Sequence, residues 1–298
     1  MTARYWFLIF ILGIGWGSSF IFNEILLREV GPFTMSLGRT GLGALGCWVY
    51  ALAVGKSVFQ SPLIILGMVL LGTINYAIPF AVYPVSQQYL AGGVAGIINA
   101  MTPVMVVIVS QFWPGGEKAT FLKTLGILAG FAGIAVLTLP SIEQGAQSEI
   151  WAILIALIAP VCYGIAVNMA RRYKDLDPVI LAMWSLTGGA LVIGPVAFTL
   201  EGLPHITQAE TWFSFAIIGF VLTSASFMVM FWLLPRVGAT ATSTVTFIAP
   251  VSSIWLGSLV LGEQVENSHL IGMAIMFVGL LLIDGRLFGR KKATTIKV

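Results

Sequence analysis

Two charged residues, Glu24 and Arg39, lie inside otherwise apolar stretches of this 298-residue chain. Ionisable side chains are costly in apolar segments of membrane length, so they are usually paired or functional. Only a short connection separates the two stretches, and we therefore expect Glu24 and Arg39 to face each other near one mouth of the molecule. The pair could open and close as a gate, or Arg39 could receive a ligand carboxylate. Alternatively, Glu24 reaches interfacial water and Arg39 anchors the ends of its segment.

A second group of candidates consists of polar and aromatic residues near the middle of apolar stretches. Hydroxyl, amide and aromatic groups together suit a small polar or zwitterionic ligand. Serine and threonine can instead bond to their own helix backbone or join helices, whereas an asparagine amide cannot satisfy all its donors and acceptors within its own helix. The predicted binding residues are Trp16, Ser19, Asn75, Tyr76, Asn99, Thr102, Tyr163 and Thr246.

Three prolines, Pro103, Pro160 and Pro250, interrupt apolar stretches. Proline removes a backbone donor and leaves a carbonyl one turn earlier unpaired. In a membrane that carbonyl must be covered by a neighbour or face a wet cavity. We predict that the three prolines act as hinges; the alternative is a static kink that improves packing.

Catalysis, metal binding and nucleic-acid binding are not indicated. No nucleophile–base pair, metal cluster or phosphate loop is visible, so we predict no enzyme activity, no cofactor and no metal. Cys47 and Cys162 fall in apolar stretches, where cysteine behaves as a small hydrophobe, and His205 and His269 are too few for a metal cluster. The net charge of +3 comes from cations in membrane-flanking loops, which gives no reason to expect a nucleic-acid partner.

The elements that must position these residues are membrane helices. Apolar residues make up 58% of the chain and charged residues 9%, against about 25% charged in a soluble domain, so most of the surface must face the lipid bilayer. Apolar segments of about 20 residues predict helices rather than barrel strands. The predicted spans are residues 5–27, 34–54, 62–82, 86–112, 119–139, 150–171, 178–200, 211–234, 237–261 and 268–288.

Basic residues predict the orientation of the chain. With the N-terminus in the cytoplasm, Arg28 is the one loop cation on the outer side, and the other loop cations fall on the inner side. Both termini are therefore predicted to be cytoplasmic.

One stretch of the sequence occurs twice. Asn99 to Pro103 is followed by Glu117, and Thr246 to Pro250 is followed by Glu263. Each half holds five predicted spans, an odd number, so the second half must enter the membrane from the opposite side. We predict an all-α polytopic membrane protein of ten helices in two inverted repeats, residues 1–145 and 146–298, the second with a short basic cytoplasmic tail.

The acidic residues and glycines of the repeated stretch have structural interpretations. Glu117 and Glu263 fall at helix-connecting turns, where a carboxylate would cap the start of the next helix. Glycines follow each of them and predict close helix contacts, within one chain or in a dimer. These glycines are Gly126, Gly130, Gly133, Gly272 and Gly279.

Several short motifs resemble one known family. They are Trp16-Gly17-Ser18-Ser19-Phe20, Pro32 followed by Arg39, Pro103 before Glu117, and Pro250 before Leu261-Gly262-Glu263. In this order, over essentially the whole chain, they resemble the drug/metabolite transporter superfamily, specifically its bacterial EamA-type branch. The resemblance implies a ten-helix inner-membrane carrier, often an exporter of amino acids or related metabolites. The second half departs from the pattern, because Ser185 stands at the counterpart of Arg39.

Residues and resemblance together predict a secondary transporter for a small-molecule substrate. We expect it to export a small polar metabolite, an amino acid or a derivative, across the inner membrane by alternating access, as a monomer or homodimer. One alternative is a carrier of quaternary-amine or cationic drug-like compounds, with an aromatic cage made of Trp16, Tyr76, Tyr83, Tyr163 and Trp232. A membrane-embedded enzyme or a scramblase is an alternative of a different class.

Overall fold

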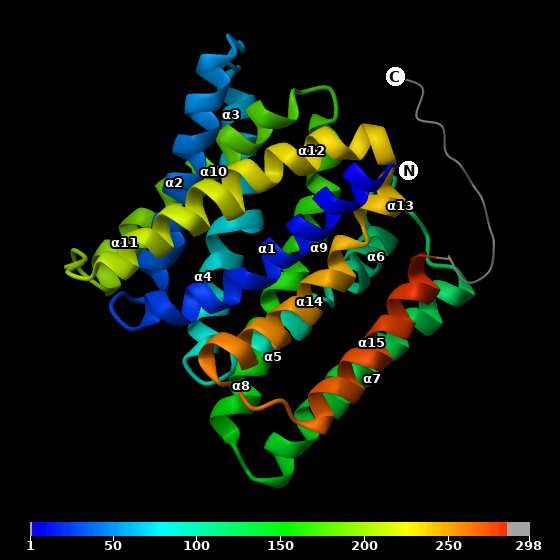
Figure 1. The fold of residues 1–298 in the computed structure, drawn as a ribbon. Coiled ribbons are helices and arrows are strands. Elements are labelled where there is room, and N and C mark those ends of the chain that lie inside the picture. The colour runs from blue at the N-terminus through cyan, green and yellow to red at the C-terminus, as the bar shows by residue number, and fades with distance from the viewer. Residues whose placement is uncertain (1, 285–298) are drawn as a thin grey trace.

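The computed structural model describes residues 2–284, and within that range the chain forms helices and no strand. Eight helices of this part are long and apolar enough to cross a membrane. Large apolar side chains such as Phe7, Trp151 and Leu191 are exposed on the surface, as expected where protein faces lipid. The chain is therefore an all-α polytopic membrane protein (Figure 1).

The helices follow one another with short connections. The first part of the chain contains α1 (Ala3–Leu27), α2 (Pro32–Ala53), α3 (Pro62–Gly72), η1 (Thr73–Ala77), α4 (Ile78–Gln87), α5 (Gly92–Asn99), α6 (Thr102–Phe112) and α7 (Phe121–Glu143). The second part contains α8 (Gln147–Ala156), α9 (Ile158–Ala170), η2 (Arg171–Tyr173), α10 (Pro178–Leu200), α11 (Ala209–Ala216), η3 (Ile217–Ala225), α12 (Ser226–Val237), α13 (Ala239–Thr242), α14 (Val245–Leu256), η4 (Gly257–Leu261) and α15 (Asn267–Asp284).

Most predicted spans coincide with a helix, but several boundaries differ. The predicted span 237–261 begins too early, because Val237 ends α12 and α14 starts only at Val245. The predicted span 86–112 begins too early, because Ser86 and Gln87 continue α4 and the next helix starts only at Gly92. The span predicted at 268–288 runs past Asp284, so its end and the predicted basic tail lie outside the described residues. Two predicted spans, α2 and the shorter apolar helix Val245–Leu261, are not among the eight membrane-length apolar helices.

Breaks in the helices lie next to two of the three predicted hinge prolines. A turn at Ala100 and Met101 separates α5 from α6 just before Pro103, and Leu157 separates α8 from α9 just before Pro160. Pro250, in contrast, lies within the uninterrupted helix α14. Three π-helical segments, η1, η3 and η4, occur among the described residues. Such segments are frequent at functional sites, and η1 and η3 contribute to the cavity described below.

Two helices, α7 and α15, run side by side at one edge of the molecule (Figure 1). A Cβ atom on Gly126 would lie 2.6 Å from the carbonyl oxygen of Gly279, and one on Gly133 would lie 2.7 Å from that of Gly272. The prediction of close helix contact at these glycines is confirmed, and the contact is within one chain. No dimer is needed to explain these four glycines.

Helices α2 and α10 are tied together at both ends. The carboxylate of Glu201, after α10, accepts hydrogen bonds from the Phe33 N–H (2.9 Å) and the Thr34 N–H (2.7 Å) at the start of α2. At the other end Lys56, after α2, pairs with Asp177, the N-cap of α10. Burial would raise the pKa of Asp177, but hydrogen bonds from Lys56 and the Val179 N–H outweigh it and hold this pKa below its usual value. The two helices are therefore antiparallel.

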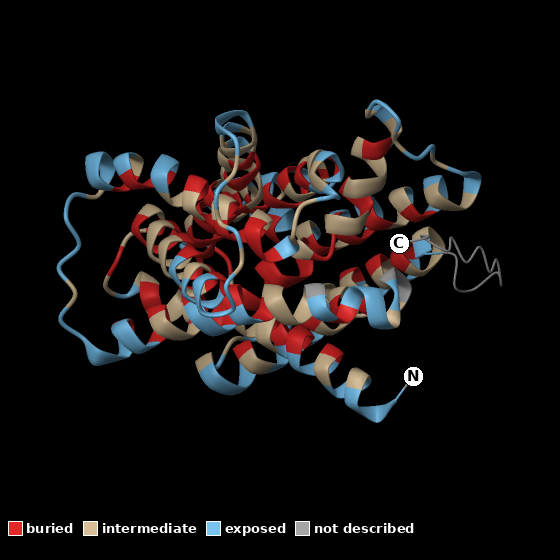
Figure 2. Ribbon diagram, turned by 90° about the horizontal axis from the view of Figure 1, so that it is seen from above, coloured by how far each residue is buried: buried red, intermediate tan, exposed pale blue. Residues whose placement is uncertain are grey.

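Buried residues concentrate in the middle of the molecule, where the helices of both parts meet (Figure 2). The cluster around Met101, Ile97 and Ile98 joins α5 to α8 and α14. A second cluster, around Met183 and Leu186, joins α10 to α2 and α4. These two clusters hold in place the helices that surround the candidate site.

Candidate functional site

A cavity of about 240 Å³ lies among the central helices. Its walls come from α1, α2, η1, α4, α5, α6, α9, η3, α12 and α14, so both parts of the chain contribute. All eight residues predicted to bind a ligand line this cavity: Trp16, Ser19, Asn75, Tyr76, Asn99, Thr102, Tyr163 and Thr246. The structure therefore gathers in one place residues that the sequence spreads over some 230 positions.

Some of these polar groups already have partners in the protein. The hydroxyl of Thr102 donates to the carbonyl of Asn99 (2.8 Å), and that of Thr246 donates to the carbonyl of Ser243 (2.7 Å). Such local bonds to the helix backbone are expected where a hydroxyl has a structural role instead of binding a ligand. The Oδ1 of Asn99 accepts from the hydroxyl of Tyr83 at 2.8 Å, so this amide is oriented by a residue of α4.

Arg39 also lines the cavity, and its contacts are with neutral groups. Its Nε donates to the hydroxyl oxygen of Thr223 (3.2 Å), and its Nη2 donates to that of Ser19 (3.3 Å). The guanidinium carbon lies 3.9 Å from the centre of the Phe80 ring, which is cation–π geometry. No acidic residue is among the described residues that line the cavity. The guanidinium charge thus faces the cavity without a protein carboxylate to neutralise it.

The predicted pairing of Glu24 with Arg39 is wrong. Glu24 accepts a hydrogen bond from the Nε2 of Gln87 at 3.2 Å and lines a different pocket. The reason is helix geometry: Arg39 contacts Ser19 on α1, and Glu24 is five residues further on. Five residues correspond to about 7.5 Å along the helix and roughly 140° around it. Glu24 therefore lies on a different face of α1 from Ser19 and at a different depth.

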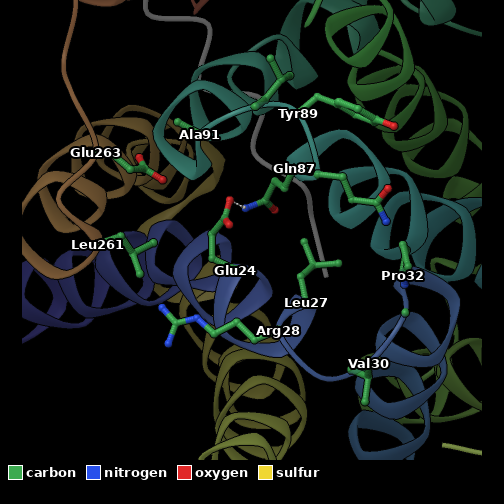
Figure 3. A pocket seen from close by; sticks show the side chains of 13 residues that line it. Glu24, Leu27, Arg28, Val30, Pro32, Gln87, Tyr89, Ala91, Leu261 and Glu263 are labelled. Carbon is green, nitrogen blue, oxygen red and sulfur yellow. Dashed lines mark hydrogen bonds between the residues drawn. The ribbon is translucent and has the colours of Figure 1, made fainter. Parts of the chain in front are cut away.

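Glu24 lines an open pocket of about 820 Å³ at the C-terminal end of α1 (Figure 3). The carboxylates of Glu24 and Glu263 both point into it, from α1 and from the turn after η4. Arg28 lines the same pocket, and 54% of its side chain is exposed.

A hydrogen-bonded bridge between α1 and α4 joins the lining of this pocket to the lining of the central cavity. Asn23 lines the cavity and donates to the Oε1 of Gln87 at 2.7 Å, whereas Gln87 lines the open pocket. The Nε2 of Gln87 in turn donates to the carbonyl of Phe20 (2.9 Å) and to Glu24. Asn23 and Gln87 are both buried, at 4% exposed. We call Asn23, Gln87 and Glu24 the polar bridge.

The predicted aromatic cage is partly assembled. Trp16, Tyr76, Tyr83 and Tyr163 line the cavity, but Trp232 is not among its lining residues. Trp232 instead carries the guanidinium groups of Arg4 and Arg236 over its ring, at 5.8 and 4.1 Å from the ring centre. Its place on α12 near the N-terminal end of α1 explains the difference.

Several residues of the site were missed by sequence reasoning. Phe80 and Phe227 form cavity walls, and Asn23 and Gln87 form the polar bridge. The repeat contains a signal for the two phenylalanines, because they are 147 residues apart, the same separation as Trp16 and Tyr163. Asn23 could have been found as an amide inside an apolar span.

The two acidic residues of the repeated stretch have different roles. Glu263 accepts hydrogen bonds from the N–H groups of Gly92 (2.6 Å) and Gly93 (3.0 Å), so it caps α5 rather than the next helix, α15. Its position in the open pocket beside the start of α5 makes this possible. Glu117 pairs with Lys123 at 2.6 Å, and 69% of its side chain is exposed. The predicted capping of the next helix is thus wrong in detail for Glu263, although Glu263 does cap a helix.

Comparison with known proteins gives several matches that cover most of the chain. The EamA-like transporter family matches residues 4–139 and again residues 150–284. The uncharacterized transporter YoaV of Bacillus subtilis is 24% identical, over 93% of this chain and 95% of that protein. A probable terminal-alkyne amino-acid exporter of Streptantibioticus cattleyicolor is 22% identical, over 98% and 97%. The probable glucose uptake protein GlcU of Priestia megaterium is 27% identical, over 96% and 99%. A crystal structure of a protein 19% identical to this chain superimposes with a TM-score of 0.68, covering 97% of this chain and all of the other.

Proposed function

Because the chain belongs to the EamA-like transporter family, we propose that it is a secondary transporter that carries a small polar metabolite through the central cavity. The substrate is an amino acid or a derivative, moved by alternating access across the bacterial inner membrane. The observation that carries the proposal is the cavity itself, which is enclosed by helices from both parts of the chain and contains Arg39. One relative is named as an amino-acid exporter and another as a glucose uptake protein. These names differ, so the residues that line the cavity must indicate the substrate.

The proposed architecture is ten membrane helices in two inverted repeats, with α2 and Val245–Leu261 as the two spans beyond the eight. Antiparallel packing of α2 on α10 supports α2 as a span. The residues that line the cavity support the repeat, since many of them occupy positions 147 residues apart in the sequence. These positions are Trp16 and Tyr163, Phe20 and Val167, Asn75 and Leu222, Phe80 and Phe227, Asn99 and Thr246, and Thr102 and Ala249. Inverted repeats place a transporter site between the halves near the bilayer midplane.

The proposed orientation has both termini in the cytoplasm, supported by the basic loops. In this orientation the open pocket at the end of α1 faces outward, and the polar bridge closes the cavity on that side. We assign the gating role, predicted for Glu24 with Arg39, to Glu24 with Gln87 and Asn23. Export is supported by the name of one relative.

A carrier for cationic compounds is not favoured by the site. Arg39 occupies the cavity that the aromatic cage would form, and Trp232 is not part of it. A second cation beside Arg39 would be repelled in surroundings of low dielectric constant.

Counterflow in proteoliposomes tests the proposed function. Vesicles loaded with unlabelled amino acid should accumulate the labelled form only when the full chain is present. The binding-site variant Asn99→Leu should abolish most of this uptake, because it removes the acceptor of Tyr83. Gln88→Leu is the control, since Gln88 is exposed and lies outside the cavity. Absence of counterflow for amino acids and related carboxylates would contradict the proposal.

Loss of the polar bridge is expected to open the outer side of the cavity. Gln87→Leu removes up to three hydrogen bonds, each contributing about 0.5–1.5 kcal/mol, so the population open to the outside should rise about tenfold or more. The reporter is Ala100→Cys, which lines the cavity, in a background without Cys47 and Cys162. Its labelling by an impermeant maleimide added from outside should accelerate accordingly.

The control for this experiment is the neighbouring residue. Gln88→Leu changes an exposed glutamine that also lines the open pocket, and it should leave the labelling rate unchanged. Equal labelling in Gln87→Leu and wild type would rule out the bridge as the outer gate.

Replacement of Pro250 by alanine tests the proposed hinge. Alanine restores an N–H that can donate one turn back within α14, so this helix should become stiffer and the transport rate should fall severalfold while substrate affinity stays the same. Pro195→Ala is the matched control, because Pro195 lies inside α10, which contributes no described residue to the cavity wall, whereas α14 contributes Val245, Thr246 and Ala249. A Pro250→Ala protein with the wild-type transport rate would show that Pro250 is a static kink.

A further inference from the structure

The charge of the cavity is set by one side chain. Among the described residues that line it, Arg39 carries a formal charge and the others are neutral. An arginine is protonated at any physiological pH. Within the membrane region an unpaired charge is expensive, and such groups normally find a partner. The lining of the cavity therefore contributes one positive charge that no described carboxylate of the protein compensates.

The contacts of Arg39 leave room for a ligand anion. Two of its nitrogens, Nε and Nη2, donate to the hydroxyl oxygens of Thr223 and Ser19. Its guanidinium lies against Phe80, at 3.9 Å. These neutral contacts fix the position of the guanidinium without neutralising it. A guanidinium has five donors in a rigid fork that matches the geometry of a carboxylate.

The described lining of the cavity offers no acidic side chain that could pair with a positive charge. The Oδ1 of Asn99 already accepts from Tyr83, and the hydroxyl oxygens of Ser19 and Thr223 already accept from Arg39. The remaining wall combines neutral polar groups, such as those of Asn75 and Tyr163, with a larger apolar surface. The apolar part includes Trp16, Phe20, Phe80, Leu222, Phe227 and Val245. A ligand ammonium would lie in this wall close to a fixed guanidinium, whereas an apolar body would fit it.

Counting charges distinguishes the ligand classes. With a monoanion bound, the site as a whole is neutral; with a zwitterion it keeps one positive charge, and with a cation it has two. Uncompensated charge is penalised strongly when water is excluded. A ligand that fills a cavity of about 240 Å³ in the middle of the protein would displace most of the water there and create such an environment.

We propose that this cavity recognises a monocarboxylate with an apolar body, whose one negative charge is neutralised by Arg39. The cavity does not recognise an amino group. This inference rests on the proposed transport function and narrows its substrate class. It makes Arg39 the residue that determines specificity for charge. Amino acids are bound through their carboxylate, and their deaminated analogues bind at least as well.

The test is binding to the purified full-length chain in lipid nanodiscs. The probe is radiolabelled 4-methylpentanoate, which is leucine without its amino group, and the competitors are leucine and leucinamide at a pH at which the amine is charged. We expect 4-methylpentanoate to bind at least as tightly as leucine and about tenfold or more tightly than leucinamide. Leucine binding more tightly than 4-methylpentanoate would overturn the inference, and so would the absence of binding by every carboxylate.

Variants of arginine separate a charge effect from loss of folding. Arg39→Gln should weaken 4-methylpentanoate binding about 30-fold or more but leave leucinamide competition unchanged or stronger. Arg39→Lys keeps the positive charge but loses the planar donor geometry of the guanidinium. Its affinity for 4-methylpentanoate should therefore lie between those of the wild type and Arg39→Gln. Arg28→Gln is the matched control, because Arg28 is an exposed arginine of the open pocket, and it should bind as wild type. If Arg39→Gln binds the carboxylate as wild type does, Arg39 is not the determinant.

Failure of this inference can be distinguished from failure of the transport function. If leucine is transported in counterflow but binds more tightly than 4-methylpentanoate, transport stands and the charge assignment is overturned. If neither compound is bound or transported, both are overturned.

Discussion

Replacement of Gly72 by alanine is expected to lower the free energy of unfolding by about 3 kcal/mol, the upper end of the usual range for overpacking. Gly72 ends α3 where this helix crosses α10. A Cβ atom there would lie 1.7 Å from the carbonyl oxygen of Ser185 and 3.0 Å from the amide nitrogen of Gly189. Both are backbone atoms, so no side chain can rotate away, and the two helices would have to separate.

The measurement is thermal unfolding of the purified protein, with Gly41→Ala as the matched control. Gly41 is also a helical glycine, in α2, but an added Cβ would meet no atom within 4 Å. Gly41→Ala should therefore unfold at or slightly above the wild-type temperature, because alanine favours helix by up to about 1 kcal/mol. Equal stability of the two variants would contradict the close crossing of α3 and α10.

The second large effect is expected from Glu263, the residue that caps α5. Glu263→Ala leaves the N–H groups of Gly92 and Gly93 without their acceptor, which should cost about 2 kcal/mol. Because α5 carries Asn99 into the cavity, substrate affinity should fall as well. Thermal unfolding and binding to the same preparation measure the two effects.

Glu117 is the matched control, since it occupies the corresponding place in the first copy of the repeated stretch. Its carboxylate pairs with Lys123 on the surface, where 69% of the Glu117 side chain is exposed. Exposed ion pairs contribute less than about 1 kcal/mol. Glu117→Ala should therefore change neither stability nor binding measurably. A Glu263→Ala protein as stable as Glu117→Ala would show that the cap contributes little.

The positions of the helices could be predicted because a membrane span needs a long apolar run, and such runs are visible in a sequence. The prediction at 86–112 was wrong at its start because Gln87 was assigned to the wrong span. Gln87 is buried at the end of α4, where Asn23 and the Phe20 carbonyl satisfy its amide. A buried polar network cannot be recognised until its partners are known.

The lining of the cavity was predicted for a similar reason: polar groups in apolar segments are costly, so they tend to face a cavity or each other. The sequence shows how deep a residue lies along its helix, but it does not show how each helix is rotated about its axis. Glu24 and Arg39 were therefore wrongly paired, since similar depth does not imply the same face. Phe80 was missed because a phenylalanine in an apolar helix is ordinary until Arg39 is found against its ring.

The difference between Arg39 and its counterpart Ser185 has a consequence for the history of the fold. If the two proposed repeats were separate, identical chains, any residue placed at this position would occur twice around the cavity. Two guanidinium groups would then demand a dianion, and two serines would leave the cavity uncharged. Two copies that mutate separately allow an odd number of charges, and with it one preferred direction for a bound ligand. Joining them in one polypeptide keeps the two different copies together around one cavity.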